Sequence, residues 1–235
     1  MHAEATLYLL PVWLGEHGDT SLLPARNIEV AERVKLFFCE DERTARRMLR
    51  RMSRNIDLGA IELHLLDKDT SDVEVGQYGL LLGQRDAAII SEAGMPCVAD
   101  PGARLVAEAH KRGIRVEPLS GPSSLLLALA ASGLNGQQFS FHGYLARDTA
   151  QRRKEIRTLE ADAARTGRAH LFIETPYRNE ALLADLLAVC QPGTRITLAV
   201  DLEQPGGAVA TRTAGEWKKV KPFLGKRPCV FIIGQ

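Results

Sequence analysis

The sequence predicts an α/β protein built from two successive α/β domains. Short apolar or β-branched runs alternate with helical patterns along the first half of the chain. The turn-forming stretch Ser-Gly-Pro-Ser at 120–123 then interrupts this alternation, and a second series of strands and helices follows. We therefore expect one domain over residues 1–119 and another over residues 120–235.

The first domain is expected to hold a mostly parallel, doubly wound sheet, because strand and helix patterns alternate in it. Ser71 and Glu74 have the spacing of a capping box at the start of one helix, and residues 102–111 carry apolar side chains at helical spacing. The predicted strands are 6–10, 35–39, 61–66, 87–91 and 115–118.

The second domain begins with an apolar helix that ends at Ala131, followed by a glycine turn at 133–136. Two longer helices are expected over 150–165 and 179–189. The predicted strands are 139–142, 170–173, 196–200, 209–213 and 229–233.

Composition and charge exclude few classes of function. Thirty Lys and Arg residues against 29 Asp and Glu give a net charge of +1, so any binding of nucleic acid must rest on a local patch. The four cysteines form no C-x-x-C pair, which favours reduced thiols in a cytoplasmic protein. No run approaches the roughly 18 apolar residues of a membrane-spanning helix, and we expect no membrane association.

The densest signal for a binding site follows the strand at 87–91. Gly94 would let a ligand approach the backbone, and Glu92 could accept hydrogen bonds from a ribose or an amino group. Asp100, Pro101 and Gly102 could then open the next helix. The alternative interpretation is a tight strand-to-helix connection in which an Asp caps the helix.

A second strand end, residues 9–15, is apolar and loop-like, as a pocket for adenine or methionine could be. Neither G-x-G-x-x-G nor G-x-x-x-x-G-K-[ST] occurs in the chain. Dinucleotide and nucleoside-triphosphate chemistry therefore lack their usual phosphate loop, whereas a cofactor without phosphates stays compatible.

Acidic and basic residues meet after the strand at 35–39. Glu40 and Asp41 follow it directly, and a helix with arginines on one face comes next. This stripe is either a solvated surface or a phosphate-binding face. The arginines of the stripe are Arg43, Arg46, Arg47, Arg50, Arg51 and Arg54. A second basic cluster comprises Arg147, Arg152, Arg153, Lys154 and Arg157, and two clusters near one cleft would favour an RNA substrate.

Other chemistries find little support. His64 and His142 have no partner at metal-ligand spacing, so we predict no metal site. The chain has no G-x-S-x-G elbow for a serine hydrolase. Glu174 and Arg178 follow a strand and could point to a ligand, but we prefer the interpretation that Pro176 beside them simply starts a helix.

Taken in order, these segments resemble the tetrapyrrole methylase superfamily, the class III S-adenosylmethionine-dependent methyltransferases. The resemblance covers nearly the whole chain, and within the superfamily it is strongest to the branch that methylates ribosomal RNA of the small subunit. The segments that carry it are 39–44, 91–102, 120–124, 142–145 and 174–178.

The resemblance implies two α/β domains with the cofactor S-adenosylmethionine in the cleft between them, commonly in a homodimer. It also implies a methyl acceptor in small-subunit rRNA, the 2'-hydroxyl of a cytidine. Glu40 or Asp41 could assist removal of the hydroxyl proton, and Arg43, Arg46 and Arg50 could bind the RNA. By position, the implied cofactor contacts are Pro11, Val12, Glu92, Gly94, Met95, Ser123, Ser124 and Ile173.

The chain also departs from the family pattern. The glycine-rich segment usual after the first strand appears as residues 13–19, with Trp13 and His17, and Glu92 replaces the usual Asp before Ala-Gly. The rRNA branch carries a small C-terminal helical region beyond the position of Gln235, and a histidine-rich stretch near the third strand is not seen. Methylation of a tetrapyrrole or another small molecule, or binding of cofactor or RNA without turnover, therefore stay as alternatives.

Overall fold

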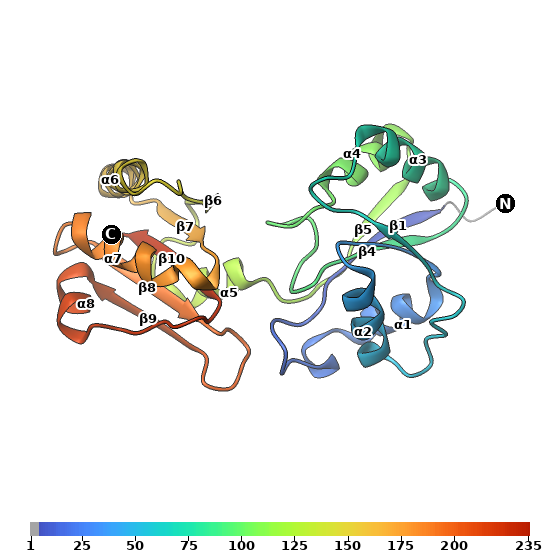
Figure 1. Cartoon of the computed structure of the whole chain (residues 1–235), viewed down its shortest axis with the longest axis horizontal. Helices are drawn as coiled ribbons and strands as arrows, with labels where there is room; N and C mark the ends of the chain where they lie inside the picture. Colours follow the sequence, from blue (N-terminus) through green and yellow to red (C-terminus); the bar gives the residue numbers. More distant parts are fainter. Residues whose placement is uncertain (1–4) are drawn as a thin grey trace. The chain divides into compact units, whose positions relative to one another are not determined.

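A computed structural model describes residues 5–235 and divides them into two compact units (Figure 1). The first unit ends at Ser123 and the second spans Ser124–Gln235. The predicted domain boundary, between residues 119 and 120, lies in the segment that joins the last strand of the first unit to the first helix of the second.

The first unit contains a five-stranded sheet in which every pair of strands is parallel, as the sequence predicts. The strand order is β3-β2-β4-β1-β5. The strands are β1 (Thr6–Leu10), β2 (Leu36–Cys39), β3 (Glu62–Leu65), β4 (Ala87–Ile90) and β5 (Arg115–Pro118). All five carboxyl ends consequently meet at one edge of the sheet, where open α/β sheets bind ligands.

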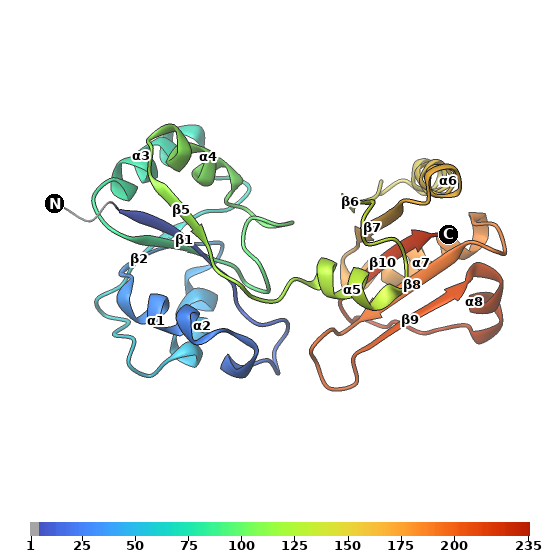
Figure 2. The same cartoon turned by 180° about the vertical axis from the view of Figure 1, so that it is seen from behind.

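Helices cover both faces of this sheet, and the strands supply a core to each (Figure 2). In β2, Phe37 points into the core under one helix pair, whereas Leu36 and Phe38 point into the core under the other. The first pair is α1 (Ala25–Arg33) and α2 (Glu42–Met52), preceded by the short helix η1 (Thr20–Leu22). The second pair is α3 (Asp72–Leu82), which starts at the predicted Ser71–Glu74 capping box, and α4 (Ala103–Lys111).

The second unit contains a mixed five-stranded sheet in the order β6-β7-β10-β8-β9. Only β6 and β7 are parallel among its described pairs, and the others are antiparallel. The connection between β8 and β9 is short and has no helix, so these strands form an antiparallel pair. The strands are β6 (Phe139–Tyr144), β7 (Ala169–Ile173), β8 (Arg195–Val200), β9 (Ala208–Thr213) and β10 (Cys229–Gly234).

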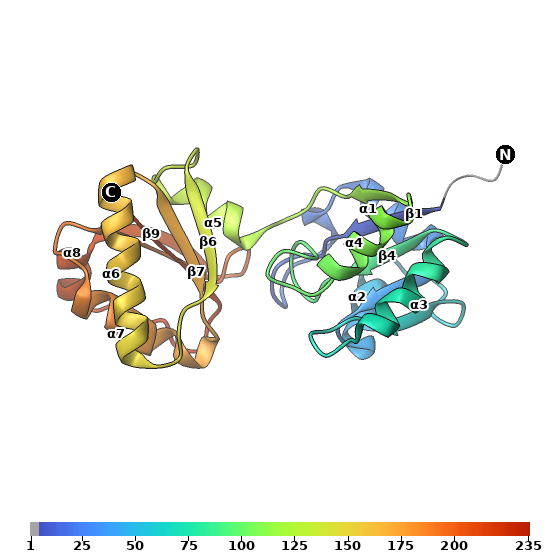
Figure 3. The ribbon, with the colours of Figure 1, turned by 90° about the horizontal axis from the view of Figure 1, so that it is seen from above.

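One face of the second sheet packs against α5 (Ser124–Ser132). The other face packs against α6 (Thr149–Thr166), α7 (Asn179–Val189) and α8 (Ala214–Val220), and the short η2 (Pro176–Arg178) precedes α7. Figure 3 shows α6 lying across that face. The stacked rings of Phe172 and Phe231, 5.9 Å between centroids, form the centre of this core.

A buried ion pair ties α6 to α7. Arg152 and Asp185 are almost fully buried, and Arg153 donates to the second carboxylate oxygen of Asp185 over 2.7 Å. Two members of the predicted basic cluster at 147–157 are thus paired with a carboxylate inside the fold. Among the described residues, the other three cations of the cluster, Arg147, Lys154 and Arg157, form no ion pair. None of the helices between residues 5 and 235 is both long and apolar enough to cross a membrane.

Candidate functional site

The predicted site residues of the first unit gather at the carboxyl edge of its sheet. Pro11 and Val12 follow β1, Glu40 follows β2 and Glu92 follows β4. Since β2, β4 and β1 are neighbours in the sheet, residues that are distant in sequence meet at this edge. The parallel strands therefore bring together four of the positions that the sequence analysis selected.

A backbone clasp joins two of the predicted cofactor contacts. The amide of Val12 donates to the carbonyl of Gly94 over 3.0 Å, and the amide of Gly94 donates to the carbonyl of Val12 over 3.1 Å. Ser91 Oγ also donates to the Gly94 carbonyl, over 2.6 Å. Gly94 has a φ of +72°, and a Cβ there would lie 3.0 Å from Leu14 Cδ2 and 3.3 Å from the Pro122 carbonyl oxygen. Only glycine fits this clasp without strain.

A second close approach holds the segment after β5 against the segment after β1. A Cβ on Gly121 would collide with the ring of Pro11, so the two backbones can approach only because residue 121 is glycine. The buried Asn27 donates from Nδ2 to the carbonyl of Ser120 over 2.9 Å. These contacts fix the turn that leads to Ser123, another predicted cofactor contact.

A cavity of about 500 Å³ opens beside Glu92. Its lining residues come from the loop after β1, from α2 and from the loop after β4. They are Gly15, Glu16, Thr44, Arg47, Met48, Arg51, Glu92 and Ala93. The cavity thus places the exposed Glu92 next to the arginine face of α2, an association that the sequence did not predict.

Arg51 also organises one wall of the cavity. Its guanidinium lies 4.6 Å from the ring centroid of Trp13 and donates to the carbonyls of Glu16 and Gly18. Trp13 is completely buried, and its Nε1 finds no hydrogen-bond partner within residues 5–235. The segment at residues 13–19, where the family pattern is altered, is therefore held to α2 by Arg51, through its contact with the Trp13 ring and its two hydrogen bonds.

The predicted RNA-binding arginines do not line this cavity. Arg46 donates to the carbonyl of Leu58 over 2.9 Å and Arg50 to the carbonyl of Arg54 over 3.3 Å, so both brace the loop after α2. Arg43 is exposed on the first turn of the helix. The side chains that reach the cavity are those of Arg47 and Arg51. Both belong to the predicted arginine face, and helical spacing alone does not distinguish them from the other arginines of that face.

Two carboxyl groups near this edge of the sheet, Glu40 and Asp100, have raised pKa values. Burial, followed by the nearby charges of Asp100, Glu92 and Asp67, raises the pKa of Glu40 to about 7. Burial, followed by the charge of Glu92, raises the pKa of Asp100 to about 6. A carboxyl group with a pKa near neutrality can exchange a proton at cellular pH.

Asp41 has a different role from Glu40. Its Oδ1 accepts a hydrogen bond from the Thr44 amide over 2.7 Å, which makes Asp41 the N-cap of α2. Its hydrogen bonds with Thr44 lower its pKa. The two residues that the sequence offered as alternatives thus differ: Asp41 caps α2 and has a lowered pKa, whereas the pKa of Glu40 is raised.

The remaining predicted positions are distributed over both units. Met95 is half-buried directly after the Gly94 clasp in the first unit. Ser124 is the first residue of α5 and Ile173 the last residue of β7, both in the second unit. Glu174 is buried and lies 2.7 Å from Arg178 in an ion pair, while Pro176 begins η2 as a helix start.

Comparisons with known proteins agree with this architecture. Residues 17–216 match the family model described as Tetrapyrrole (Corrin/Porphyrin) Methylases. The chain is 38% identical over 184 residues to a protein of Micromonospora olivasterospora named ribosomal RNA small subunit methyltransferase I. It is 30% identical over 235 residues to the protein of that name from Escherichia coli O157:H7. These matches cover 78% and 99% of this chain, but 55% and 78% of the two relatives, so the chain spans only about half the length of the first.

Solved structures share the fold at low sequence identity. The methyltransferase CobJ matches with a TM-score of 0.61 at 19% identity, covering 99% of this chain and 94% of that one. Uroporphyrin III C-methyltransferase from Thermus thermophilus matches with a TM-score of 0.59 at 16% identity, covering 98% of both chains. Because the family model matches most of the sequence, this chain belongs to the tetrapyrrole (corrin/porphyrin) methylase family.

Proposed function

We propose that the chain catalyses methyl transfer from S-adenosylmethionine to small-subunit ribosomal RNA, at the 2'-hydroxyl of a cytidine. Family membership supports methyl transfer, and the names of relatives at 38% and 30% identity support the rRNA acceptor. The observation that carries the proposal is the carboxyl edge of the first sheet, where Glu92, the Gly94 clasp and Glu40 follow neighbouring strands.

The residues at this edge suit the cofactor. The cavity beside Glu92 has the size of a small-molecule site, and the exposed carboxylate can accept hydrogen bonds from ribose hydroxyls or an ammonium group. The chain has no phosphate-binding loop, and the cofactor has no phosphate. When bound, it supplies a methyl group that its sulfonium has already activated. We keep Pro11, Val12, Met95, Ser123, Ser124 and Ile173 with Glu92 and Gly94 as its proposed contacts.

Glu40 is the proposed proton acceptor for the ribose hydroxyl. With a pKa of about 7, a substantial fraction of Glu40 is ionised at cellular pH, and the ionised form is still basic enough to take a proton. Asp41 is no longer proposed as a base, because capping holds its pKa low. Arg43, Arg46 and Arg50 remain proposed RNA contacts, and Arg47 joins them because it is exposed on the same arginine face of α2.

Cofactor binding is tested by Gly94→Val, with Gly113→Val as the matched control. Both glycines have a positive φ, but Gly113 has open space around its Cβ position and follows α4 away from the clasp. In calorimetry with S-adenosylhomocysteine, we expect Gly94→Val to lose binding and Gly113→Val to keep it. Equal affinities in the two variants would remove the clasp from the cofactor site.

RNA binding by the arginine face is tested through salt dependence. Replacing Arg43, Arg46, Arg47 and Arg50 by Gln should flatten the slope of log K against log salt for binding to small subunits. A control variant with Lys218, Lys219 and Lys221 replaced should keep the slope. An unchanged slope in the arginine variant would make that face an ordinary solvated surface.

The acceptor is tested by transfer of tritiated methyl from S-adenosylmethionine into small ribosomal subunits from a strain deleted for the gene. We expect incorporation into these subunits and none into wild-type subunits, whose site is already methylated. If the chain binds the cofactor but labels neither, a tetrapyrrole or another small molecule becomes the preferred acceptor. Incorporation followed by nuclease mapping would identify the nucleotide. Homodimerisation and a cytoplasmic location stay predictions.

A further inference from the structure

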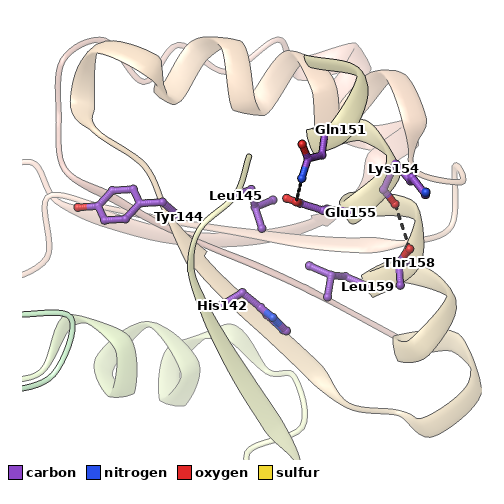
Figure 4. Close-up of a pocket in the computed structure, with 8 residues that line it drawn as sticks. All are labelled: His142, Tyr144, Leu145, Gln151, Lys154, Glu155, Thr158 and Leu159. Carbon is purple, nitrogen blue, oxygen red and sulfur yellow. Dashed lines mark hydrogen bonds between the residues drawn. The ribbon is translucent and has the colours of Figure 1, made fainter. Parts of the chain in front are cut away.

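The second unit contains a cavity of its own, between the edge strand β6 and the helix α6 (Figure 4). Its volume of about 490 Å³ is typical of small-molecule sites. Leu145 and Leu159 give it apolar walls, and polar side chains surround them. Its lining residues are His142, Tyr144, Leu145, Gln151, Lys154, Glu155, Thr158 and Leu159.

A chain of hydrogen-bonding groups orients His142 in this cavity. His142 Nε2 lies 2.9 Å from Nδ1 of the buried His170. His170 Nε2 in turn lies 3.2 Å from Asp162 Oδ2, without the straight geometry of a full hydrogen bond. Arg165 donates to the other carboxylate oxygen of Asp162 over 2.5 Å and holds that side chain in place.

The carboxylate determines which ring nitrogens carry protons. The negative charge of Asp162, 3.2 Å from Nε2, favours the neutral His170 tautomer with its proton on that nitrogen, in which Nδ1 accepts a hydrogen bond. His142 Nε2 is then the donor, and its Nδ1 keeps a free lone pair. Burial is the largest cause that lowers the pKa of both histidines, so both rings are neutral at pH 7. In this tautomer His142, which lines the cavity, has Nδ1 as a hydrogen-bond acceptor.

The opposite wall of the cavity, formed by α6, carries the charged side chains of Lys154 and Glu155. Glu155 is already used, because its two oxygens accept from the Ala146 amide over 2.8 Å and from Gln151 Nε2 over 3.3 Å. Lys154 is exposed and forms no ion pair with any residue from 5 to 235. Arg157 follows one turn later on the same side of α6 and is likewise exposed. Lys154 and Arg157 together outnumber the carboxylate of Glu155, so this end of α6 carries a net positive charge that an anion can approach.

We infer that this cavity binds one nucleotide of the RNA substrate. Lys154 contacts its phosphate, and His142 Nδ1 accepts a hydrogen bond from the amino group of its base. Tyr144, 60% exposed at one end of the cavity, offers a ring on which a base can stack. Lys154 alone would give no preference among anions, and the oriented histidine adds a requirement for a donor group. The inference rests on the proposed RNA substrate.

The experiment measures binding of a short, fluorescently labelled single-stranded RNA by anisotropy at several salt concentrations. We expect Lys154→Gln to weaken binding about tenfold and to lower the salt slope by about one, because one phosphate contact is lost. His142→Phe should weaken binding without changing the slope, because it removes a neutral acceptor. Lys219→Gln, an equal loss of charge on α8, serves as the control and should change neither quantity.

Folding of the variants is checked independently. Lys154 is exposed, so Lys154→Gln keeps the fold whatever happens to His142→Phe. The ¹⁵N spectrum of the wild-type imidazole rings should show His142 neutral with its proton on Nε2. A proton on Nδ1 instead would overturn the assignment of His142 as an acceptor.

The outcomes also separate this inference from the proposed function. If wild-type protein methylates small subunits but Lys154→Gln and His142→Phe bind the RNA as Lys219→Gln does, the nucleotide site is refuted and methyl transfer stands. If these variants lose affinity but no methyl enters the subunits, the nucleotide site stands and the proposed reaction fails. Failure of the wild-type protein to bind the RNA would refute the nucleotide site.

Discussion

Replacing Glu40 by Gln should stabilise the protein in a pH-dependent way. The folded state raises the pKa of Glu40 to about 7 from its ordinary value of 4.5, because the side chain is half-buried among Asp100, Glu92 and Asp67. A raised carboxyl pKa means that folding disfavours the ionised form. The stability that wild-type protein has at low pH is therefore lost progressively as pH rises from about 4.5 to about 7. Gln cannot ionise, so the variant escapes this loss.

The size of the effect follows from the pKa change. At about 1.4 kcal/mol for each pKa unit, the full change corresponds to about 3 kcal/mol at alkaline pH. Solvent reaches part of the side chain and screens its neighbours, which reduces the expected gain to about 1–2 kcal/mol. This gain should be present at about pH 8 and much smaller at about pH 5.

Urea denaturation of wild-type and Glu40→Gln protein at the two pH values measures the difference directly. Glu74→Gln is the control, and its effect on stability should have the opposite sign, because the hydrogen bonds of the capping box lower the pKa of Glu74. A gain for Glu40→Gln that does not grow between the two pH values would refute the acidic, desolvated environment of Glu40. The same variant should reduce the rate of methyl transfer about 10²-fold. Glu40 would then be a carboxylate that lowers the stability of the fold and is kept because the reaction needs it.

Three further substitutions test the packing that supports the two sites. Arg152→Met should lower the free energy of unfolding by about 3 kcal/mol in urea, since it leaves Asp185 buried with only Arg153 as a partner; unchanged stability would contradict the buried pair. Phe231→Ala should cost about 3–5 kcal/mol in calorimetric melting because the side chain is fully buried, and a loss below about 1 kcal/mol would show that the core collapses around it. Gly121→Ala should lower Tm and weaken S-adenosylhomocysteine binding together, because its Cβ would displace Pro11; a variant with wild-type Tm and affinity would disprove the close approach.

Strand positions followed from the sequence because they depend on local patterns. Each predicted strand agrees with an observed one to within two residues at either end. The largest difference is in β6, which was predicted to end at His142 and continues to Tyr144. Gly143 indicated a stop, but it has a φ of +63° and the pairing with β7 shifts register there, so the strand passes through an irregularity instead of ending.

The direction of the strands in the second unit was not available from their patterns. Alternation of strands and helices predicts parallel pairing in the first unit, where helices connect the strands. In the second unit β10, the last strand, inserts between β7 and β8 and runs antiparallel to both. Its apolar sequence shows that it is buried, but the same composition suits either direction.

By itself, the sequence determined the two series of strands and helices, the apolar face of α2 and the Ser71 capping box. These features depend on side chains a few residues apart, and hydrophobic spacing and backbone sterics act at that range. Tertiary structure alone decided that Arg47 faces the cavity, that Asp185 neutralises Arg152, and that His170 orients His142. It also decided the pKa of Glu40, since burial and the charges of Asp67, Glu92 and Asp100 come from segments that meet only when the sheet forms. Charge and proton affinity depend on distance in space, which the spacing of residues along the chain does not encode.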